Sequence, residues 1–136
     1  MTFDKMKTST KVLIWTARIL FILVILLISL FALDSFSPER SFWQNTAAFL
    51  VHLIPSIILL AVLIIAWKWE KIGGIIVVFV GLAAGIFLFI FNYKRIHSVA
   101  TSIYVTLTIA MPLVLAGILF ITSHYRKKKE LSGVQQ

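Results

Sequence analysis

The sequence has no cysteine among its 136 residues. Disulfide frameworks, thiolate nucleophiles and thiol redox relays are therefore excluded, and the redox state of the compartment stays unconstrained. Charged residues are also scarce, at 13% of the chain against about 25% in typical soluble proteins. Because 60% of the residues are hydrophobic, a soluble fold could not bury them all. The composition indicates an integral membrane protein.

Four long apolar runs fill most of the chain. A helix needs about 20 residues, at ~1.5 Å rise each, to cross a bilayer, and each run has that length. The runs cover residues 12–33, 43–66, 72–91 and 99–122. We expect an all-α, four-span, up-and-down bundle that forms a single membrane domain over residues 1–136. The polar tail 130–136 is expected to be frayed.

The first apolar run follows three lysines and could be mistaken for a secretory signal. Its length of 22 residues, 12–33, exceeds the ~7 to 15 of a signal core. No small-x-small cleavage site follows it, so we expect a retained first span.

The net charge of +8 is unevenly distributed along the chain. With a cytoplasmic amino terminus, ten basic residues fall on the inner side and three on the outer side, which fits the positive-inside rule. The inner set is Lys5, Lys7, Lys11, Arg18, Lys68, Lys71 and the run 126–129; the outer set is Arg40, Lys94 and Arg95. We expect an inner (plasma) membrane location with both termini cytoplasmic. The basic run after the last span favours contact with anionic lipids rather than nucleic acid.

Arg18 and Glu70 are ionisable groups near the inner boundary of the spans. Arg18 lies about six residues into the first span and could bend its side chain toward water. It could instead pair with Glu70, because a guanidinium presents a planar fork to a carboxylate. Glu70 has a simpler role available as well, since a carboxylate is favoured at the start of a helix.

His52 is the one histidine within hydrocarbon depth, and Pro55 follows it. Proline lacks an amide hydrogen and frees a carbonyl one turn earlier. Ser56 lies four residues after His52 on the same helical face, and Asp34 could approach from the outer end of the first span. These groups could form a polar notch for protons or a ligand. Alternatively, His52 and Ser56 simply bond to helix carbonyls around the proline.

Gly74, Gly81 and Gly85 recur at spacings of seven and four in the third span. They share one helical face, and the last two form a small-xxx-small pattern that permits close backbone approach. We expect this face to be a packing groove inside the bundle. A homodimer seam is the alternative, because the same pattern serves both uses.

The sequence matches none of the common catalytic motifs. Serine, histidine and carboxylate do not meet at a common depth, and neither a phosphate loop nor a metal-ligand cluster is evident. His97 and His124 fall at opposite membrane faces, so neither a metal site nor a bis-histidine haem site is expected. The chain is expected to be no enzyme and to carry no cofactor.

Several fragments together resemble a family of small, uncharacterised four-helix membrane proteins from prokaryotes, classed as a domain of unknown function. The fragments are FALDSF at 31–36, HLIP at 52–55, AWKWEKIGG at 66–74, and PL at 112–113 leading to GILF at 117–120. The resemblance implies an architecture and no activity. The positions to test first are Asp34, His52, Pro55, Trp69, Glu70, Gly73 and Gly74.

The sequence thus favours a non-enzymatic structural or accessory membrane component, acting as a homo-oligomer or beside a membrane-protein partner. The alternative is a small transporter or channel subunit that uses the polar notch near His52 and Asp34.

Overall fold

The computed structural model describes residues 6–133 of the chain, so Lys5 and the last three residues lie outside it. The described part contains four α-helices and one short 3₁₀ helix. Their bounds are α1 (Thr8–Phe31), η1 (Ala32–Ser35), α2 (Phe42–Lys68), α3 (Glu70–Ile96) and α4 (Val99–Gly133). All four α-helices are long and apolar enough to cross a membrane. The predicted all-α fold with four candidate spans is therefore confirmed.

The fourth helix is longer than its apolar run predicts. It has 35 residues, or about 50 Å at 1.5 Å rise per residue, and it continues eleven residues past Thr122 to Gly133. The expectation that the tail frays from Glu130 onward is wrong for residues 130–133. The reason is a tertiary contact, because the carboxylate of Glu130 accepts hydrogen bonds from the start of α1.

Local signals explain where the helices begin and end. Ser41 caps α2 in a capping box, in which its hydroxyl accepts from the Gln44 amide while the Gln44 side chain accepts from the Ser41 amide. Only Trp69 separates α2 from α3, and its non-helical backbone (φ -129°, ψ 79°) reverses the chain. His97 ends α3 in the left-handed conformation, at a φ of 54°.

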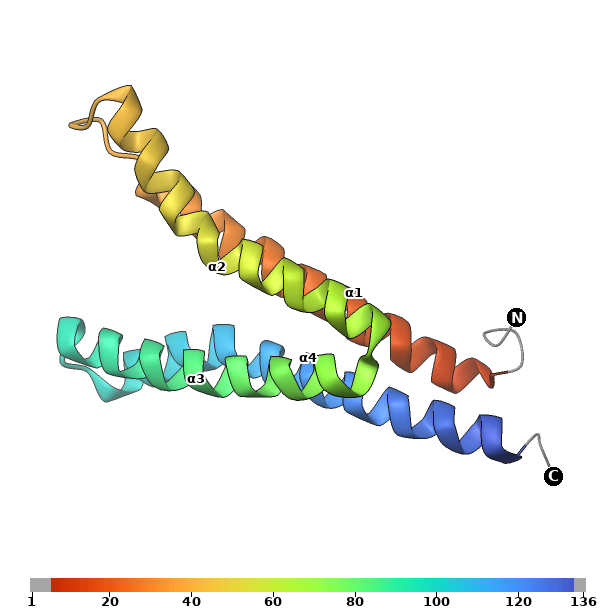
Figure 1. Ribbon diagram of the computed structural model, residues 1–136. Helices are drawn as coiled ribbons and strands as arrows, with labels where there is room; N and C mark the ends of the chain where they lie inside the picture. Colours follow the sequence, from red (N-terminus) through yellow and green to blue (C-terminus); the bar gives the residue numbers. More distant parts are fainter. Residues whose placement is uncertain (1–5, 134–136) are drawn as a thin grey trace.

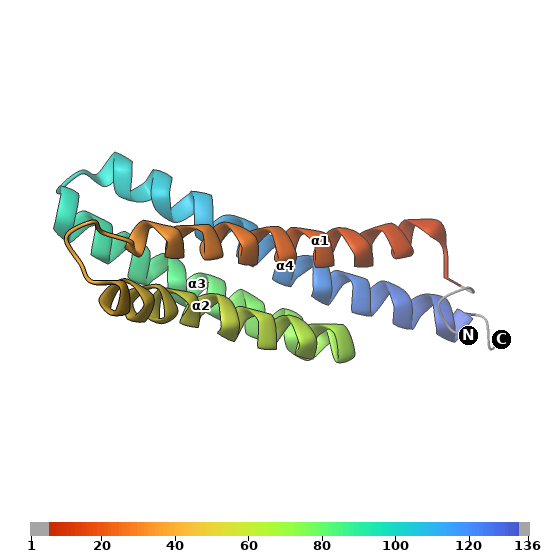
Figure 2. The ribbon, with the colours of Figure 1, turned by 90° about the horizontal axis from the view of Figure 1, so that it is seen from above.

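Successive helices run antiparallel and form two hairpins, α1–α2 and α3–α4 (Figures 1 and 2). The start of α1, the end of α4 and the α2–α3 turn lie toward one end, here termed the terminal end. The opposite end, termed the loop end, carries the α1–α2 and α3–α4 connections. Figure 1 shows the hairpins side by side at the terminal end and diverging toward the loop end. Beyond the α2–α3 turn, only α1 and α4 continue.

The hydrophobic core follows this divergence. The fully buried rings of Phe21 and Phe120 pack edge to face, with centroids 6.2 Å apart. The core includes Ala17, Val24, Leu59, Val62, Leu63, Ala66, Val77, Leu113 and Ala116. Its α1 members end at Val24 and its α2 members begin at Leu59, so the contact between the hairpins belongs to the half of the bundle nearest the termini.

Small residues bring α3 directly against its neighbours. A Cβ at Gly74 would lie 2.8 Å from the Gly117 carbonyl oxygen of α4, and a Cβ at Gly81 would lie 2.8 Å from a Val114 methyl group. At Gly85 the nearest atom would be the Ala110 Cβ, at 3.2 Å. The glycine face is thus the internal packing groove that was predicted. A homodimer seam would need this face to be exposed, but α4 covers it.

Candidate functional site

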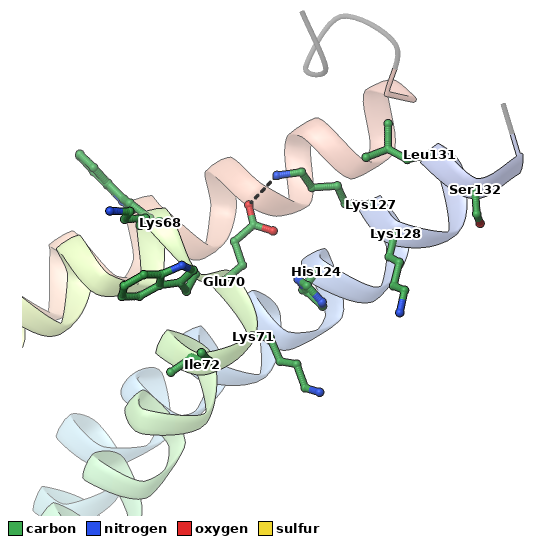
Figure 3. Close-up of a pocket in the computed structure, with 11 residues that line it drawn as sticks. Lys68, Glu70, Lys71, Ile72, His124, Lys127, Lys128, Leu131 and Ser132 are labelled. Carbon is green, nitrogen blue, oxygen red and sulfur yellow. Dashed lines mark ion pairs between the residues drawn. The ribbon is translucent and has the colours of Figure 1, made fainter. Parts of the chain in front are cut away.

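A hollow with several polar side chains lies at the terminal end, between the α2–α3 turn and the extension of α4 (Figure 3). It is an open groove of about 630 Å³. Its lining comes from residues 67–72 on one side and from His124, Lys127, Lys128, Leu131 and Ser132 on the other. We refer to this hollow as the basic groove, because four of its side chains are lysines.

Two of these lysines lie against aromatic rings. The Lys68 ammonium is 5.1 Å from the ring centroid of Trp69, and the Lys71 ammonium is 5.9 Å from that of Tyr125. Both lysines are exposed. A cation over an aromatic face gains about 0.5–1 kcal/mol at an exposed site, so the rings restrain the ammonium groups while leaving them accessible.

Glu70 is the carboxylate of the basic groove. It is the first residue of α3, where the helix dipole favours a negative charge, and it is only 6% exposed. Its Oε1 lies 3.6 Å from the Lys127 ammonium of α4, and Figure 3 shows the two side chains pointing toward one another. Its Oε2 is buried without a hydrogen-bond partner in the described part of the chain. The alternative in which Glu70 pairs with Arg18 is therefore wrong, and Glu70 instead forms a loose pair with Lys127.

Arg18 has aromatic neighbours instead of a carboxylate. Its guanidinium carbon lies 5.6 Å from the ring centroids of both Trp15 and Trp67. Its Nε is buried and forms no hydrogen bond within residues 6–133. Trp67 also lines the basic groove, so this ring joins the α1 cation to the groove wall.

A second polar contact ties α4 to α1 at the terminal end. Glu130 accepts a hydrogen bond from the Thr10 hydroxyl at 2.8 Å and another from the Lys7 backbone N–H at 3.0 Å. The hydrogen bond from Thr10, followed in size by that from the Lys7 N–H, holds the pKa of the Glu130 carboxyl below its ordinary value near 4.5. We refer to this contact as the Glu130 latch. This contact was not predicted from the sequence. The one feature that could have indicated it is an acidic residue directly after a run of four basic residues.

The polar notch considered as one alternative around His52 is not assembled by any hydrogen bond among residues 6–133. The Nδ1–H of His52 donates to the Ala48 carbonyl of its own helix at 2.8 Å, and the ring is exposed. Ser56 is buried and its hydroxyl has no partner there, so the expected bond from Ser56 to a helix carbonyl is wrong. Asp34 lies exposed in η1, and α2 continues through Pro55.

The sequence-derived candidates thus fall into three places. Glu70 lines the basic groove, Gly74, Gly81 and Gly85 lie in the seam between α3 and α4, and His52 lies toward the loop end. The sequence placed His124 at a membrane face and Lys127 and Lys128 in the basic run after the last span, and it did not indicate that they line a groove. Their role depends on α4 continuing as a helix beside the α2–α3 turn.

The chain belongs to a family described as a domain of unknown function (DUF7670), whose model matches residues 6–132. The predicted resemblance to an uncharacterised family is therefore confirmed over nearly the whole described part. No curated protein and no solved structure matches the chain.

Proposed function

Starting from this family membership, we propose that the chain is a non-enzymatic structural or accessory component of the inner (plasma) membrane, with both termini in the cytoplasm. The observation that carries the proposal is the location of the polar contacts between helices. The basic groove and the Glu130 latch both lie at the terminal end.

The distribution of charge supports the orientation. Of the basic residues in the described part, the terminal end holds Lys7, Lys11, Arg18, Lys68, Lys71 and residues 126–129, and the loop end holds Arg40, Lys94 and Arg95. Such an excess of Lys and Arg marks the cytoplasmic side of membrane proteins. The terminal end therefore belongs on the cytoplasmic side.

Several hydroxyl groups inside the spans favour an accessory role over transport, whereas those of Ser56 and Thr106, which are buried without a partner in the described part of the chain, do not. Ser29, Thr108 and Thr122 each donate to a carbonyl four residues earlier in their own helix. His52 does the same. Polar groups that are satisfied within one helix do not need a water-filled path between helices.

The orientation can be tested because the chain has no native cysteine. Glu39→Cys places a thiol in the exposed loop between α1 and α2, and Ser132→Cys places one near the end of α4. In intact cells, a membrane-impermeant maleimide should label the first variant at once and the second only after permeabilisation. The reverse labelling pattern would overturn the orientation.

A second experiment separates an accessory protein from a transporter. Purified protein in liposomes should show no more proton or solute flux than empty liposomes, whereas crosslinking in native membranes should recover a membrane-protein partner or a second copy. Flux that disappears in His52→Ala would establish the transporter alternative instead.

A further inference from the structure

We propose that the basic groove is a discrete binding site for the phosphate of a phospholipid headgroup. The inference rests on the proposed function only in placing the chain in a lipid bilayer. It goes further by replacing a diffuse attraction of the basic tail to anionic lipid with a defined site on two separate segments of the chain.

Charge is the first argument. Lys68 and Lys71 come from the α2–α3 turn, and Lys127 and Lys128 come from α4. The groove also contains Glu70, so four lysines and one glutamate give a formal charge of +3 with His124 neutral. This excess of positive charge on two walls of one groove favours a compact anion, and a basic pocket between helices is a known form of headgroup site.

The second argument is that two of the four cations are already held in position. Lys68 and Lys71 lie against aromatic rings. A site whose side chains are restrained before binding loses less entropy when the ligand arrives. Lys128 also lines the groove, and Figure 3 shows its side chain extending from α4 in a different direction from that of Lys127.

The third argument distinguishes a lipid from free phosphate. The groove combines its lysines with Trp67, Trp69, Ile72 and Leu131. Tryptophan prefers the headgroup level of a bilayer, where one part of its ring is in apolar surroundings and its N–H is near water. Because α2 and α3 enter the apolar region directly from the turn, a headgroup in the groove would have its acyl chains beside these helices.

Two neighbouring lysines provide a matched test. Lys128 lines the groove and Lys129 does not, yet Lys128→Gln and Lys129→Gln change the net charge equally and lie on the same exposed part of α4. Native mass spectrometry of delipidated protein with added phosphatidylglycerol would measure lipid retention. Lys128→Gln should lower it about fivefold, which corresponds to roughly 1 kcal/mol per basic residue, and Lys129→Gln should leave it near the wild-type level. Equal losses would indicate diffuse attraction only and would overturn the proposal.

Glu70→Gln should act in the opposite direction. The variant removes the carboxylate of the groove and frees Lys127, so retention of phosphatidylglycerol should rise several-fold, while Glu39→Gln at the loop end should not change it. Unchanged melting temperatures would show that both variants are folded. A Glu70→Gln variant that is folded but shows no rise would contradict the electrostatic basis of the site.

The source of the phosphate is tested by comparing ligands. Phosphatidylglycerol should be retained by the wild-type protein in the presence of millimolar inorganic phosphate. If inorganic phosphate alone binds and displaces the lipid, the site is one for a soluble anion and the phospholipid assignment is overturned. Neither result depends on which way the chain is inserted, so failure of this site is distinguishable from failure of the cysteine-labelling experiment.

Discussion

The terminal end and the loop end of the bundle are stabilised in different ways. At the terminal end both hairpins contribute to one core around Phe21 and Phe120, and α1 and α4 are joined by the Glu130 latch. At the loop end the hairpins diverge, and the contacts are local, as between Asn45 and Ser37. The two hairpins are therefore held together mainly by contacts in the terminal half of the molecule, whereas the contacts at the loop end lie within one hairpin.

The largest expected effect is the loss of the shared core. Phe120→Ala removes a fully buried ring that contacts Phe21 across the hairpins, and such a truncation costs about 3–5 kcal/mol. The free energy of unfolding, measured by denaturant titration in mixed micelles, should fall by that amount. Phe79→Ala is the control, because Phe79 is 72% exposed. Equal losses in both variants would mean that Phe120 does not join the hairpins.

Substitutions along the glycine seam should come next. Alanine at Gly74 would meet a backbone oxygen that cannot move aside, alanine at Gly81 would meet a side-chain methyl group, and alanine at Gly85 would meet the Ala110 Cβ at 3.2 Å. Overpacking costs about 1–3 kcal/mol, so the unfolding free energy should fall most for Gly74→Ala and least for Gly85→Ala. The opposite order would contradict a seam that is tightest near the terminal end.

Asn45 tests the loop end. Its side chain accepts from the Ser37 amide at 3.0 Å and donates to the Ser37 carbonyl at 2.9 Å. Asn45→Ala should cost about 1 kcal/mol and speed hydrogen exchange of the Ser37 amide without changing exchange around Phe120. Faster exchange at both ends would show that the two ends are coupled after all.

The smallest effect is expected from the Glu130 latch, and it depends on pH. Because the folded protein holds the pKa of Glu130 below 4.5, the latch contributes stability above that pH and loses it as the pH falls through the folded-state value. The wild-type melting temperature should therefore fall between pH 5 and pH 3 by more than that of Glu130→Gln. Glu39→Gln should behave like the wild type, and a Glu130→Gln variant with the full wild-type pH dependence would exclude the latch as its cause.

The four helices and the glycine face were predictable because they depend on local composition. A run of about 20 apolar residues that crosses a membrane must form its backbone hydrogen bonds within itself. It therefore folds as a helix. The spacing of Gly74, Gly81 and Gly85 then fixes a common face. His52 likewise found a partner within its own helix, at the Ala48 carbonyl.

The partners of charged side chains were less predictable. Arg18 was considered as a partner for Glu70 because both lie at the same membrane depth, yet the partner of Glu70 is Lys127. Depth along a helix axis is a property of the sequence, but the choice among several cations at one depth depends on helix rotation and neighbour order. A single sequence does not supply those two quantities.

By itself, the sequence determined the helical class, the approximate spans, the glycine seam and the excess of positive charge at one end. Only the tertiary structure decided that α4 continues to Gly133, that Glu130 contacts the start of α1, and that lysines from two segments line one groove. The physical reason is the separation along the chain over which each interaction acts. Backbone hydrogen bonding and residue spacing act within a few residues, whereas the latch and the groove join positions more than fifty residues apart, which become neighbours only when the hairpins pack.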